Sequence, residues 1–345
     1  MKARFMWSGM STIMIPDGYR PALDLKETQI AIKKVKDFFQ KLLAAELNIR
    51  RVTAPLFVEP ETGLNDNLNG VERPVSFGIR EQGDRQVEVV QSLAKWKRMA
   101  LGRYGFDVGE GIYTDMNAIR RDEDTDNIHS IYVDQWDWEK IIEKKDRNEE
   151  CLRENVRLVY DALRVTEKYI SNQYSYIRCV LPENITFIPT VELEKRYPDL
   201  TPHEREYKAA KAYGAIFVER IGGPLENGKP HDGRAPDYDD WNLNGDIILY
   251  YPVLDIAMEI SSMGIRVDSE TLASQLKASH CEERANLPFQ RAILENRLPY
   301  TIGGGIGQSR LSMFFLRKAH IGEVQVSVWP DADVQYASDH GVTLL

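Results

Sequence analysis

Residues 303–310 have the sequence Gly-Gly-Gly-Ile-Gly-Gln-Ser-Arg, and an apolar segment, residues 311–316, follows them directly. Closely spaced glycines let the backbone approach a flat or charged ligand, and the planar cation of Arg310 stacks on rings and pairs with phosphate. We therefore interpret this stretch as a glycine loop and an arginine followed by a core helix, an arrangement suited to a nucleotide. A tight turn that binds nothing is the alternative interpretation.

The common nucleotide-binding motifs do not match this stretch. A P-loop needs a lysine followed by serine or threonine directly after its glycines, and the sequence has none there. Gly303, Gly305 and Gly307 alternate, so the spacing also differs from the dinucleotide-binding G-x-G-x-x-G motif. The kind of nucleotide site must therefore be inferred from other segments.

Composition narrows the class of protein. The chain has 345 residues, of which 43% are hydrophobic and 28% charged, as in ordinary globular proteins. Its net charge of −9 argues against broad binding to nucleic acid, and no apolar stretch approaches the roughly 20 residues of a membrane helix. Three widely spaced cysteines favour a cytoplasmic protein without a disulfide framework. We expect residues 1–20 to be an N-terminal extension and residues 21–345 to form one domain.

The order of the expected elements predicts an α+β fold. Apolar periodicity predicts a long helix over residues 24–48, and shorter patterns predict helices at 93–102, 139–174, 190–197, 201–213, 268–280 and 282–296. Strands are expected at 51–57, 88–91, 112–119, 130–138, 246–251 and 255–261. Because strands and helices do not alternate strictly, we expect an antiparallel sheet flanked by helices and not a doubly wound fold.

Polar side chains recur on the faces of two expected strands. Alternation places Gln135 and Asp137 on one face of residues 130–138, and Glu259 and Ser261 on one face of residues 255–261. Cations lie in the loop at residues 120–124, in the helical turn at 95–98 and in the acidic segment 233–241. Each group has a plain alternative as a solvated surface, and each also suits a ligand-binding edge.

Longer blocks of sequence carry a family resemblance. They are Gln-Ser-Leu-Ala-Lys-Trp-Lys-Arg at 91–98, Ser-Ile-Tyr-Val-Asp-Gln-Trp-Asp-Trp-Glu at 130–139, Arg-Ala-Pro-Asp-Tyr-Asp-Asp-Trp at 234–241, Glu-Ile-Ser-Ser-Met-Gly-Ile-Arg-Val at 259–267 and Thr-Ile-Gly-Gly-Gly-Ile-Gly-Gln-Ser-Arg at 301–310. In this order they resemble ammonia-dependent asparagine synthetase, the aspartate–ammonia ligase, from about Leu23 to the C-terminus. The resemblance implies the catalytic fold of class II aminoacyl-tRNA synthetases, usually as a homodimer, with the long first helix and Pro55 at the dimer interface.

The same resemblance implies an activity and its ligands. Aspartate, ATP and ammonia would be the substrates, Mg²⁺ the metal cofactor, and a β-aspartyl-adenylate the intermediate, with pyrophosphate and AMP released. No nucleic-acid or membrane partner is expected.

The resemblance also implies roles for individual residues. The expected catalytic residues are Arg120, Gln135 and Asp66. Binding of the amino-acid substrate is expected of Asp66, Ser92, Lys97, Arg120, Gln135, Asp137, Arg234, Asp239 and Ser261. Binding of the nucleotide is expected of Arg120, Ser130, Val133, Asp246, Glu259, Arg266 and Arg310, and binding of the metal ion of Asp246 and Glu259.

The loop at residues 120–123 departs from the family pattern. The second class II motif is Arg-x-Glu, and both Arg120-Arg-Asp122 and Arg121-Asp-Glu123 nearly fit it. The family's own blocks favour Arg120, and Arg121 is the alternative. Arg310 is expected to meet either the adenine ring or the phosphates.

Two other functions compete with the ligase. An enzyme of the aspartyl- or asparaginyl-tRNA synthetase type would need an anticodon-binding module, for which the segment before Leu23 is too short. A catalytically silent relative would lack site residues, yet Arg120, Glu259 and Arg310 are all present. The sequence therefore favours the ligase.

Overall fold

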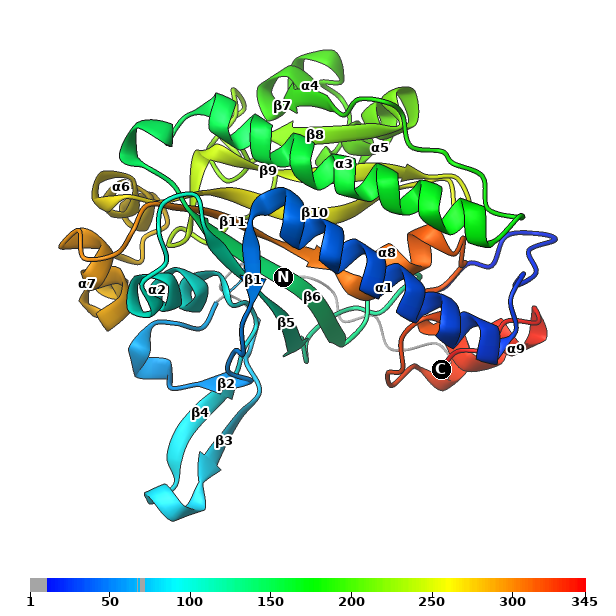
Figure 1. Ribbon diagram of the computed structural model, residues 1–345, viewed down its shortest axis with the longest axis horizontal. Helices are drawn as coiled ribbons and strands as arrows, with labels where there is room; N and C mark the ends of the chain where they lie inside the picture. Colours follow the sequence, from blue (N-terminus) through cyan, green and yellow to red (C-terminus); the bar gives the residue numbers. More distant parts are fainter. Residues whose placement is uncertain (1–10, 67, 69–71) are drawn as a thin grey trace.

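An eight-stranded sheet forms the centre of the computed structural model, which describes residues 11–66, 68 and 72–345, and a three-stranded sheet extends from it (Figure 1). The helices are α1 (Leu25–Leu47), α2 (Ala94–Tyr104), α3 (Glu149–Gln173), α4 (Thr190–Arg196), α5 (Pro202–Tyr213), α6 (Ser269–Ala278), α7 (Pro288–Leu294), α8 (Gln308–Phe315) and α9 (Asp331–Asp339). The strands are β1 (Ile49–Arg51), β2 (Phe57–Val58), β3 (Ser76–Ile79), β4 (Arg85–Val89), β5 (Gly111–Ile119), β6 (Tyr132–Ile141), β7 (Thr186–Pro189), β8 (Ala215–Glu219), β9 (Asp239–Tyr251), β10 (Ile256–Arg266) and β11 (Thr301–Gly307).

The large sheet has the strand order β1-β5-β6-β11-β10-β9-β8-β7. Its central pairs are antiparallel, and only the outer pairs, β1 with β5 and β7 with β8, are parallel. The predicted α+β class with a mainly antiparallel sheet is therefore confirmed.

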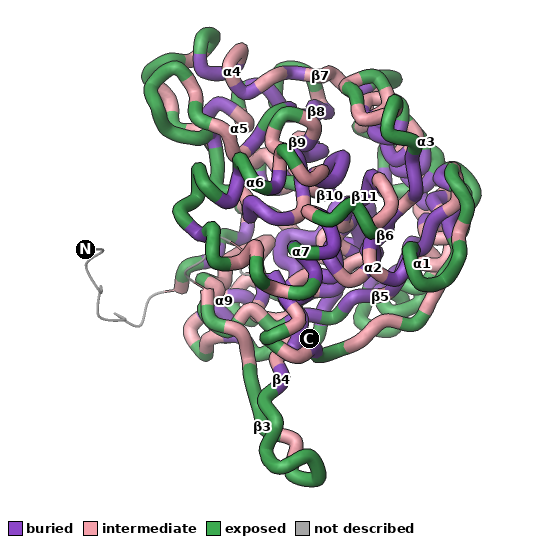
Figure 2. The backbone as a smooth tube through the Cα atoms, turned by 90° about the vertical axis from the view of Figure 1, so that its left-hand side faces the viewer, coloured by how far each residue is buried: buried purple, intermediate pink, exposed green. Residues whose placement is uncertain are grey.

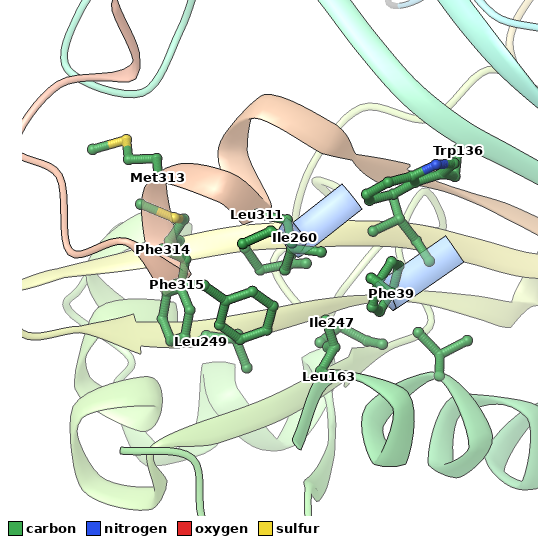
Figure 3. Close-up of a cluster of buried hydrophobic side chains, with 14 of the residues drawn as sticks. Phe39, Trp136, Leu163, Ile247, Leu249, Ile260, Leu311, Met313, Phe314 and Phe315 are labelled. Atoms are coloured by element: carbon green, nitrogen blue, oxygen red, sulfur yellow. The ribbon is translucent and has the colours of Figure 1, made fainter. Parts of the chain in front are cut away.

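The main core lies between one face of this sheet and helices α1, α3 and α8. Helix α1 begins after Asp24, whose side chain accepts a hydrogen bond from the Glu27 amide, and ends where Asn48 adopts the left-handed conformation. Its apolar stripe buries Val35, Phe39 and Leu43, among others. Figure 3 shows Phe39 beside Trp136 of β6, with their ring centroids 5.0 Å apart. This packing directs the alternate side chains of β6 to the opposite face of the sheet.

The glycine stretch is a central strand, which corrects the loop expected from sequence. β11 pairs with β6 on one side and with β10 on the other, with Gly303 opposite Glu139 and Gly264. Glycine is required because the neighbouring strands fill the adjacent space. A Cβ on Gly304 would lie 2.5 Å from Cβ of Met263, and one on Gly305 would lie 2.5 Å from the Gln135 side chain. The core helix expected after Arg310 is confirmed as α8, which starts at Gln308.

Several boundaries differ from the sequence prediction. The helix expected at 139–174 is α3, which begins only at Glu149, because β6 continues through Ile141. β7 and β8 were not predicted; every residue of β8 is buried, so that segment has no alternation to reveal a strand. The helix expected at 93–102 is α2, which begins at Ala94 and continues to Tyr104, and the Ser92 hydroxyl accepts a hydrogen bond from the Ala94 amide at 3.1 Å.

The small sheet β2-β4-β3 projects away from the body, and Figure 2 shows β3 as an exposed arm. Phe57 and Phe77 stack edge-to-face on it, with ring centroids 5.3 Å apart, and each is 42% exposed. None of the helices that the structure describes is both long and apolar enough to cross a membrane.

The segment before α1 contacts the C-terminal part of the chain. The side chains of Ser11 and Thr12 donate to the buried carboxylate of Asp333, and the Tyr19 hydroxyl donates to Glu323 at 3.0 Å. Residues 1–10 of the expected extension lie outside the described part of the chain.

Candidate functional site

A cavity of about 530 Å³ opens on the face of the large sheet opposite the main core. Backbone of Gly304, Gly305 and Gly307 forms part of its floor, and side chains of β6 and β10 flank them. The cavity brings together most of the residues expected from sequence, namely Asp66, Ser92, Arg120, Ser130, Val133, Gln135, Asp137, Arg234, Asp239, Glu259, Arg266 and Arg310.

Three expected residues do not line the cavity. Lys97 and Asp246 lie behind its wall, where Lys97 contacts Asp137 and Asp246 contacts Arg234. Ser261 is also absent from the wall, because the pairing of β10 with β9 shifts register between Glu259 and Ser261. The shift places Ser262 at the cavity, which simple strand alternation could not predict.

The loop after β5 presents one of its two adjacent arginines to the cavity. Arg120 lines the wall, whereas Arg121 is exposed and does not. The Arg120 guanidinium lies 3.7 Å from the Glu123 carboxylate, and its Nε has no hydrogen-bond partner among the described residues. Arg120 therefore retains donors that a ligand could use.

Behind the Gln135 and Asp137 wall lies a buried cation. Lys97 is fully buried, contacts the Asp137 carboxylate and donates to the Trp138 carbonyl at 2.8 Å. Burial lowers the pKa of Lys97, although the carboxylates of Asp137 and Glu139 oppose that effect. Lys97 thus acts on the cavity through Asp137.

Sequence reasoning missed the carboxylate that organises this region, Glu139. It is fully buried and forms two parallel hydrogen bonds with Arg266, at 2.9 and 2.7 Å, while Arg266 also contacts Asp239. Burial alone would raise the pKa of the Glu139 carboxyl group. The positive charge of Arg266 has the larger effect, so the pKa is lowered. The available signal was its place in the 130–139 block, on the same strand face as Gln135 and Asp137.

A second missed residue, Asp134, connects three parts of the chain beside the glycine strand. Its carboxylate accepts from the Ser309 amide at 3.0 Å, the Ser309 hydroxyl at 2.8 Å, Gln325 at 3.3 Å and Lys36 of α1 at 2.9 Å. Asp134 is only 7% exposed, so these donors have little competing water. The carboxylate also lies at the N-terminus of α8, where negative charge is favourable.

The other end of the cavity combines arginines with carboxylates. Arg310 donates to the Glu259 carbonyl at 2.8 Å, and its guanidinium lies 4.0 Å from the Glu259 carboxylate. Arg234 contacts Asp246 on the adjacent strand. Burial raises the pKa of Asp246 to about 7; Arg234 opposes this shift and Glu259 adds to it.

The carboxylates of Asp246 and Glu259 supply only part of the oxygen ligands that a hard cation needs. Carboxylate oxygens are the ligands that Mg²⁺ prefers, usually one or two of them together with phosphate oxygens and water. Within the described residues, no group of at least three His, Cys, Asp or Glu side chains is arranged to hold a metal ion. Glu259 lines the cavity, whereas Asp246 lies behind it against Arg234, so Mg²⁺ that arrives with a polyphosphate would meet Glu259 directly and Asp246 only after Arg234 releases it.

Comparison with solved structures identifies the fold. The chain resembles an asparaginyl-tRNA synthetase from Pyrococcus horikoshii, solved with asparaginyl-adenylate, with a TM-score of 0.63 and 15% identity over 87% of this chain and 68% of that one. A corresponding Entamoeba histolytica synthetase, also solved with asparaginyl-adenylate, gives a TM-score of 0.62 and 14% identity, and this chain spans 66% of its length. The fold is therefore that of class II aminoacyl-tRNA synthetases.

Comparison of sequences identifies the family. A family model described as aspartate-ammonia ligase matches residues 26–341. An aspartate–ammonia ligase from Ruminiclostridium cellulolyticum is 60% identical over 336 residues, which cover 97% of this chain and all of the relative. One from Fusobacterium nucleatum is 64% identical over 311 residues, covering 90% of this chain and 94% of the relative. The chain belongs to the aspartate–ammonia ligase family.

Proposed function

We propose that this ligase joins ammonia to the β-carboxyl group of L-aspartate through a β-aspartyl-adenylate, with ATP as the second substrate. Family membership supports the overall reaction. The observation that carries the adenylate route is a single cavity in which Arg120 and Gln135 lie together with the glycine strand and Arg310. Amino acid and nucleotide would share this one space, as transfer between them requires.

In the first step, a β-carboxylate oxygen of aspartate attacks the α-phosphorus of ATP. A new O–P bond forms while the bond to the β-phosphate breaks, and pyrophosphate leaves. Such transfers depend mainly on positioning and on neutralising charge at the phosphate. We assign that task to Arg120, whose donors are incompletely used by Glu123.

The amino-acid substrate is assigned to the end of the cavity formed by β6 and the start of α2. Gln135, Asp137 and Ser92 line it, and Lys97 supports Asp137 from behind. The wall that carries Arg234 and Asp239 would lie across the bound ligand. Asp66 faces the same end and is assigned to catalysis.

The nucleotide is assigned to β11 and its neighbours. The glycine backbone gives adenosine or phosphate close access, and Arg310 either stacks on adenine or pairs with phosphates. Ser130, Val133 and Arg266 line the same cavity, and Glu139 holds Arg266 in place. Asp246 and Glu259 would hold Mg²⁺, which supplies neutralising charge to the phosphates when bound.

In the second step, ammonia attacks the activated carbonyl carbon. A C–N bond forms, the C–O bond to AMP breaks, and asparagine is released. Neutral ammonia is itself a nucleophile, so the chain has to place it and keep water from attacking the adenylate instead.

The assembly and location are also proposals. Leu25 and Ile30 of α1 are about half exposed, as are Phe57 and Phe77 on the small sheet, and these apolar surfaces would be covered in a homodimer. Sedimentation at several protein concentrations tests whether the chain forms a dimer.

The free cysteines Cys151, Cys179 and Cys281 are consistent with a reducing, cytoplasmic location.

The decisive assay incubates the protein with aspartate, ATP, Mg²⁺ and ammonium. We expect AMP and asparagine in equal amounts, and exchange of labelled pyrophosphate into ATP when aspartate is present without ammonium. If AMP and asparagine do not form, the proposed function is wrong. If instead the amino acid appears on added tRNA, the chain acts as a synthetase of the kind its fold resembles.

A further inference from the structure

The cavity opens to solvent at the end that carries Arg310 and Glu259. The Asp137 side chain, at the amino-acid end, is 4% exposed, whereas those of Arg310 and Glu259 are 21% and 48% exposed. His203, the second residue of α5, also lines the cavity, and its side chain is 88% exposed. His203 therefore lies at the solvent-facing mouth of the cavity.

Helix α5 brings His203 to this mouth because it packs on the same face of the sheet as the cavity. Ala209 of α5 belongs to an apolar cluster with Ile248 of β9, and Ala257 of β10 packs against that cluster. Strand alternation places Ala257 and Glu259 on one face of β10, and Glu259 lines the cavity. The first turn of α5 thus meets the face that carries Glu259.

The His203 ring is oriented from behind by Glu206. His203 Nδ1 lies 3.4 Å from Oε2 of Glu206, and the other carboxylate oxygen, Oε1, lies 2.8 Å from Nε2 of His231. The His231 side chain is fully buried, and residues 232–234, which follow it, line the cavity. Because a carboxylate only accepts hydrogen bonds, His203 donates from Nδ1, and its Nε2 is left for a ligand.

The charges around His203 favour its protonated form. The hydrogen bond to Glu206 raises the pKa of His203, burial opposes this shift, and the nearby carboxylates of Asp232 and Glu259 raise it further. A phosphate that approaches Nε2 acts in the same direction. An imidazolium donates from both nitrogens, so His203 can offer a positive charge and an N–H donor at the mouth.

The proposed adenylation step moves charge toward this mouth. The β- and γ-phosphates of ATP leave as pyrophosphate, which has to pass into solvent. Of the arginines at this end, Arg234 contacts Asp246, and Arg310 lies 4.0 Å from the Glu259 carboxylate, so both share their charge with protein anions. Phosphoryl transfer is favoured by groups that neutralise the departing phosphates. A further N–H donor at the mouth would therefore help pyrophosphate to leave.

We propose that His203 binds the terminal phosphates of ATP and the pyrophosphate that leaves, and that Glu206 is the positioning residue that orients its ring. This inference rests on the proposed adenylate route. His203 donates from Nε2 to an oxygen of the β- or γ-phosphate. As the bond between the α-phosphorus and the bridging oxygen breaks, its electron pair moves to pyrophosphate, and the imidazolium stabilises that charge while keeping its proton.

The other parts of the substrates fit this place less well. The amino acid needs an enclosed end, and Asp137, with Lys97 directly behind it, provides one. The adenine ring needs a flat surface, which the glycine backbone of β11 and the Arg310 guanidinium offer deeper in the cavity. A strongly hydrated polyphosphate suits the exposed mouth.

The test separates pyrophosphate from AMP by product inhibition of asparagine formation. AMP carries adenine and the α-phosphate, whereas pyrophosphate occupies only the part of the site assigned to His203. The inhibition constant of each product and the KM values for ATP and aspartate are measured for His203→Ala and His203→Lys. His340→Ala is the matched control, because His340 ends α9 with ordinary negative φ and lies outside the cavity.

We expect His203→Ala to raise the inhibition constant of pyrophosphate about 10-fold, which corresponds to about 1.4 kcal/mol, as for loss of one charge-assisted hydrogen bond. The KM for ATP should rise with it, while the inhibition constant of AMP and the KM for aspartate stay unchanged. His203→Lys should recover most of the affinity for pyrophosphate, because an ammonium also donates to phosphate oxygens. The exposed side chain makes few contacts, so both variants should keep the wild-type unfolding midpoint in urea.

The role of Glu206 is tested by a double-mutant cycle. Glu206→Gln keeps the size of the side chain but removes the carboxylate that His203 and His231 share. It should weaken pyrophosphate binding in the wild-type background and have no further effect in the His203→Ala background, since it acts through His203. Additive effects would show that Glu206 does not orient the ring.

An unchanged inhibition constant of pyrophosphate in His203→Ala would overturn the proposal, and so would equal increases for pyrophosphate and AMP, which indicate a general distortion of the cavity. A lysine variant as weak as the alanine variant would contradict the role of charge. A wild-type protein that exchanges no pyrophosphate into ATP would instead refute the adenylate route, so the two failures are distinguishable.

Discussion

Substituting alanine for Gly303 tests why the central strand consists of glycine. A Cβ at this position would lie 2.5 Å from the Trp138 carbonyl oxygen, 2.6 Å from Nη2 of Arg266, and closer still to the Glu139 carboxylate. Nonbonded carbon contacts settle at about 3.5–4.0 Å, so the strands must separate by about 1 Å or the Glu139–Arg266 pair must open.

Separating the strands and opening the Glu139–Arg266 pair both reduce the free energy of unfolding. Overpacking a core typically costs about 1–3 kcal/mol, and breaking a buried ion pair costs about 3–5 kcal/mol. We therefore expect Gly303→Ala to lower the free energy of unfolding by about 3 kcal/mol or more, a large part of the 5–15 kcal/mol typical of folded proteins.

The assay is equilibrium unfolding in urea, followed by the fluorescence of Trp136 and Trp138, which are fully buried. Gly307→Ala is the matched control, because a Cβ there meets only Cβ of Arg310, at 3.3 Å, and Gly307 has ordinary negative φ. Its cost should stay near 1 kcal/mol, the usual effect of alanine at a helix cap. Equal unfolding midpoints for the two variants would refute the steric reasoning.

The remaining predictions concern three other side chains. Arg120→Ala should abolish pyrophosphate exchange while the unfolding curve stays unchanged, since its guanidinium is partly exposed; an unchanged exchange rate would transfer the role to Arg121. Asp134→Ala should leave the buried donors of Ser309 unpaired, and so cost about 2 kcal/mol or more and raise the KM for ATP in steady-state assays more than that for aspartate. Burial lowers the pKa of His320 to about 4, below its unfolded value, so stability should be complete above pH 6.5 and fall by roughly 3 kcal/mol as pH decreases to 4; His320→Asn should flatten that dependence in urea titrations.

Controls accompany these predictions. Arg121→Ala should keep the exchange rate, because Arg121 does not line the cavity. Asp134→Asn keeps acceptors for Ser309 and should lose less stability than alanine does; an equal loss would contradict the hydrogen-bond explanation. A wild-type unfolding free energy that stays constant between pH 6.5 and 4 would show that His320 is not kept neutral by burial.

Local patterns and blocks of sequence predicted much of the fold. The periodicity of residues 24–48 predicted α1 almost to its ends, because capping and an apolar stripe are local properties. The family blocks predicted the class II fold. Strand β8 was not predicted, because burial on both faces removes the alternation of polar and apolar residues that marks a strand. The glycine stretch was misread as a loop because the side chains that make a strand of it, such as Gln135 and Met263, belong to its neighbours.

In the candidate site, too, some residues were predicted from sequence and others were found only in the structure. Arg120, Gln135 and Asp137 were named from sequence, and the structure brings them to one cavity, while their roles stay predictions. Glu139 and Asp134 were not named, because their importance comes from partners more than 100 residues away, such as Arg266 and Ser309. Ser261 was placed by alternation, which fails across the register shift in β10.

Burial of the Lys97, Glu139 and Arg266 charges has a consequence for ionic strength. Dissolved salt screens exposed charges over about 10 Å at 0.1 M but reaches buried pairs much less. These three side chains are at most 3% exposed, so Lys97 should keep its contact with Asp137 at the amino-acid end in concentrated salt. Arg120 and Arg310 keep part of their surface in solvent, and their attraction for phosphate should weaken. Salt should therefore raise the KM for ATP well before it changes the KM for aspartate.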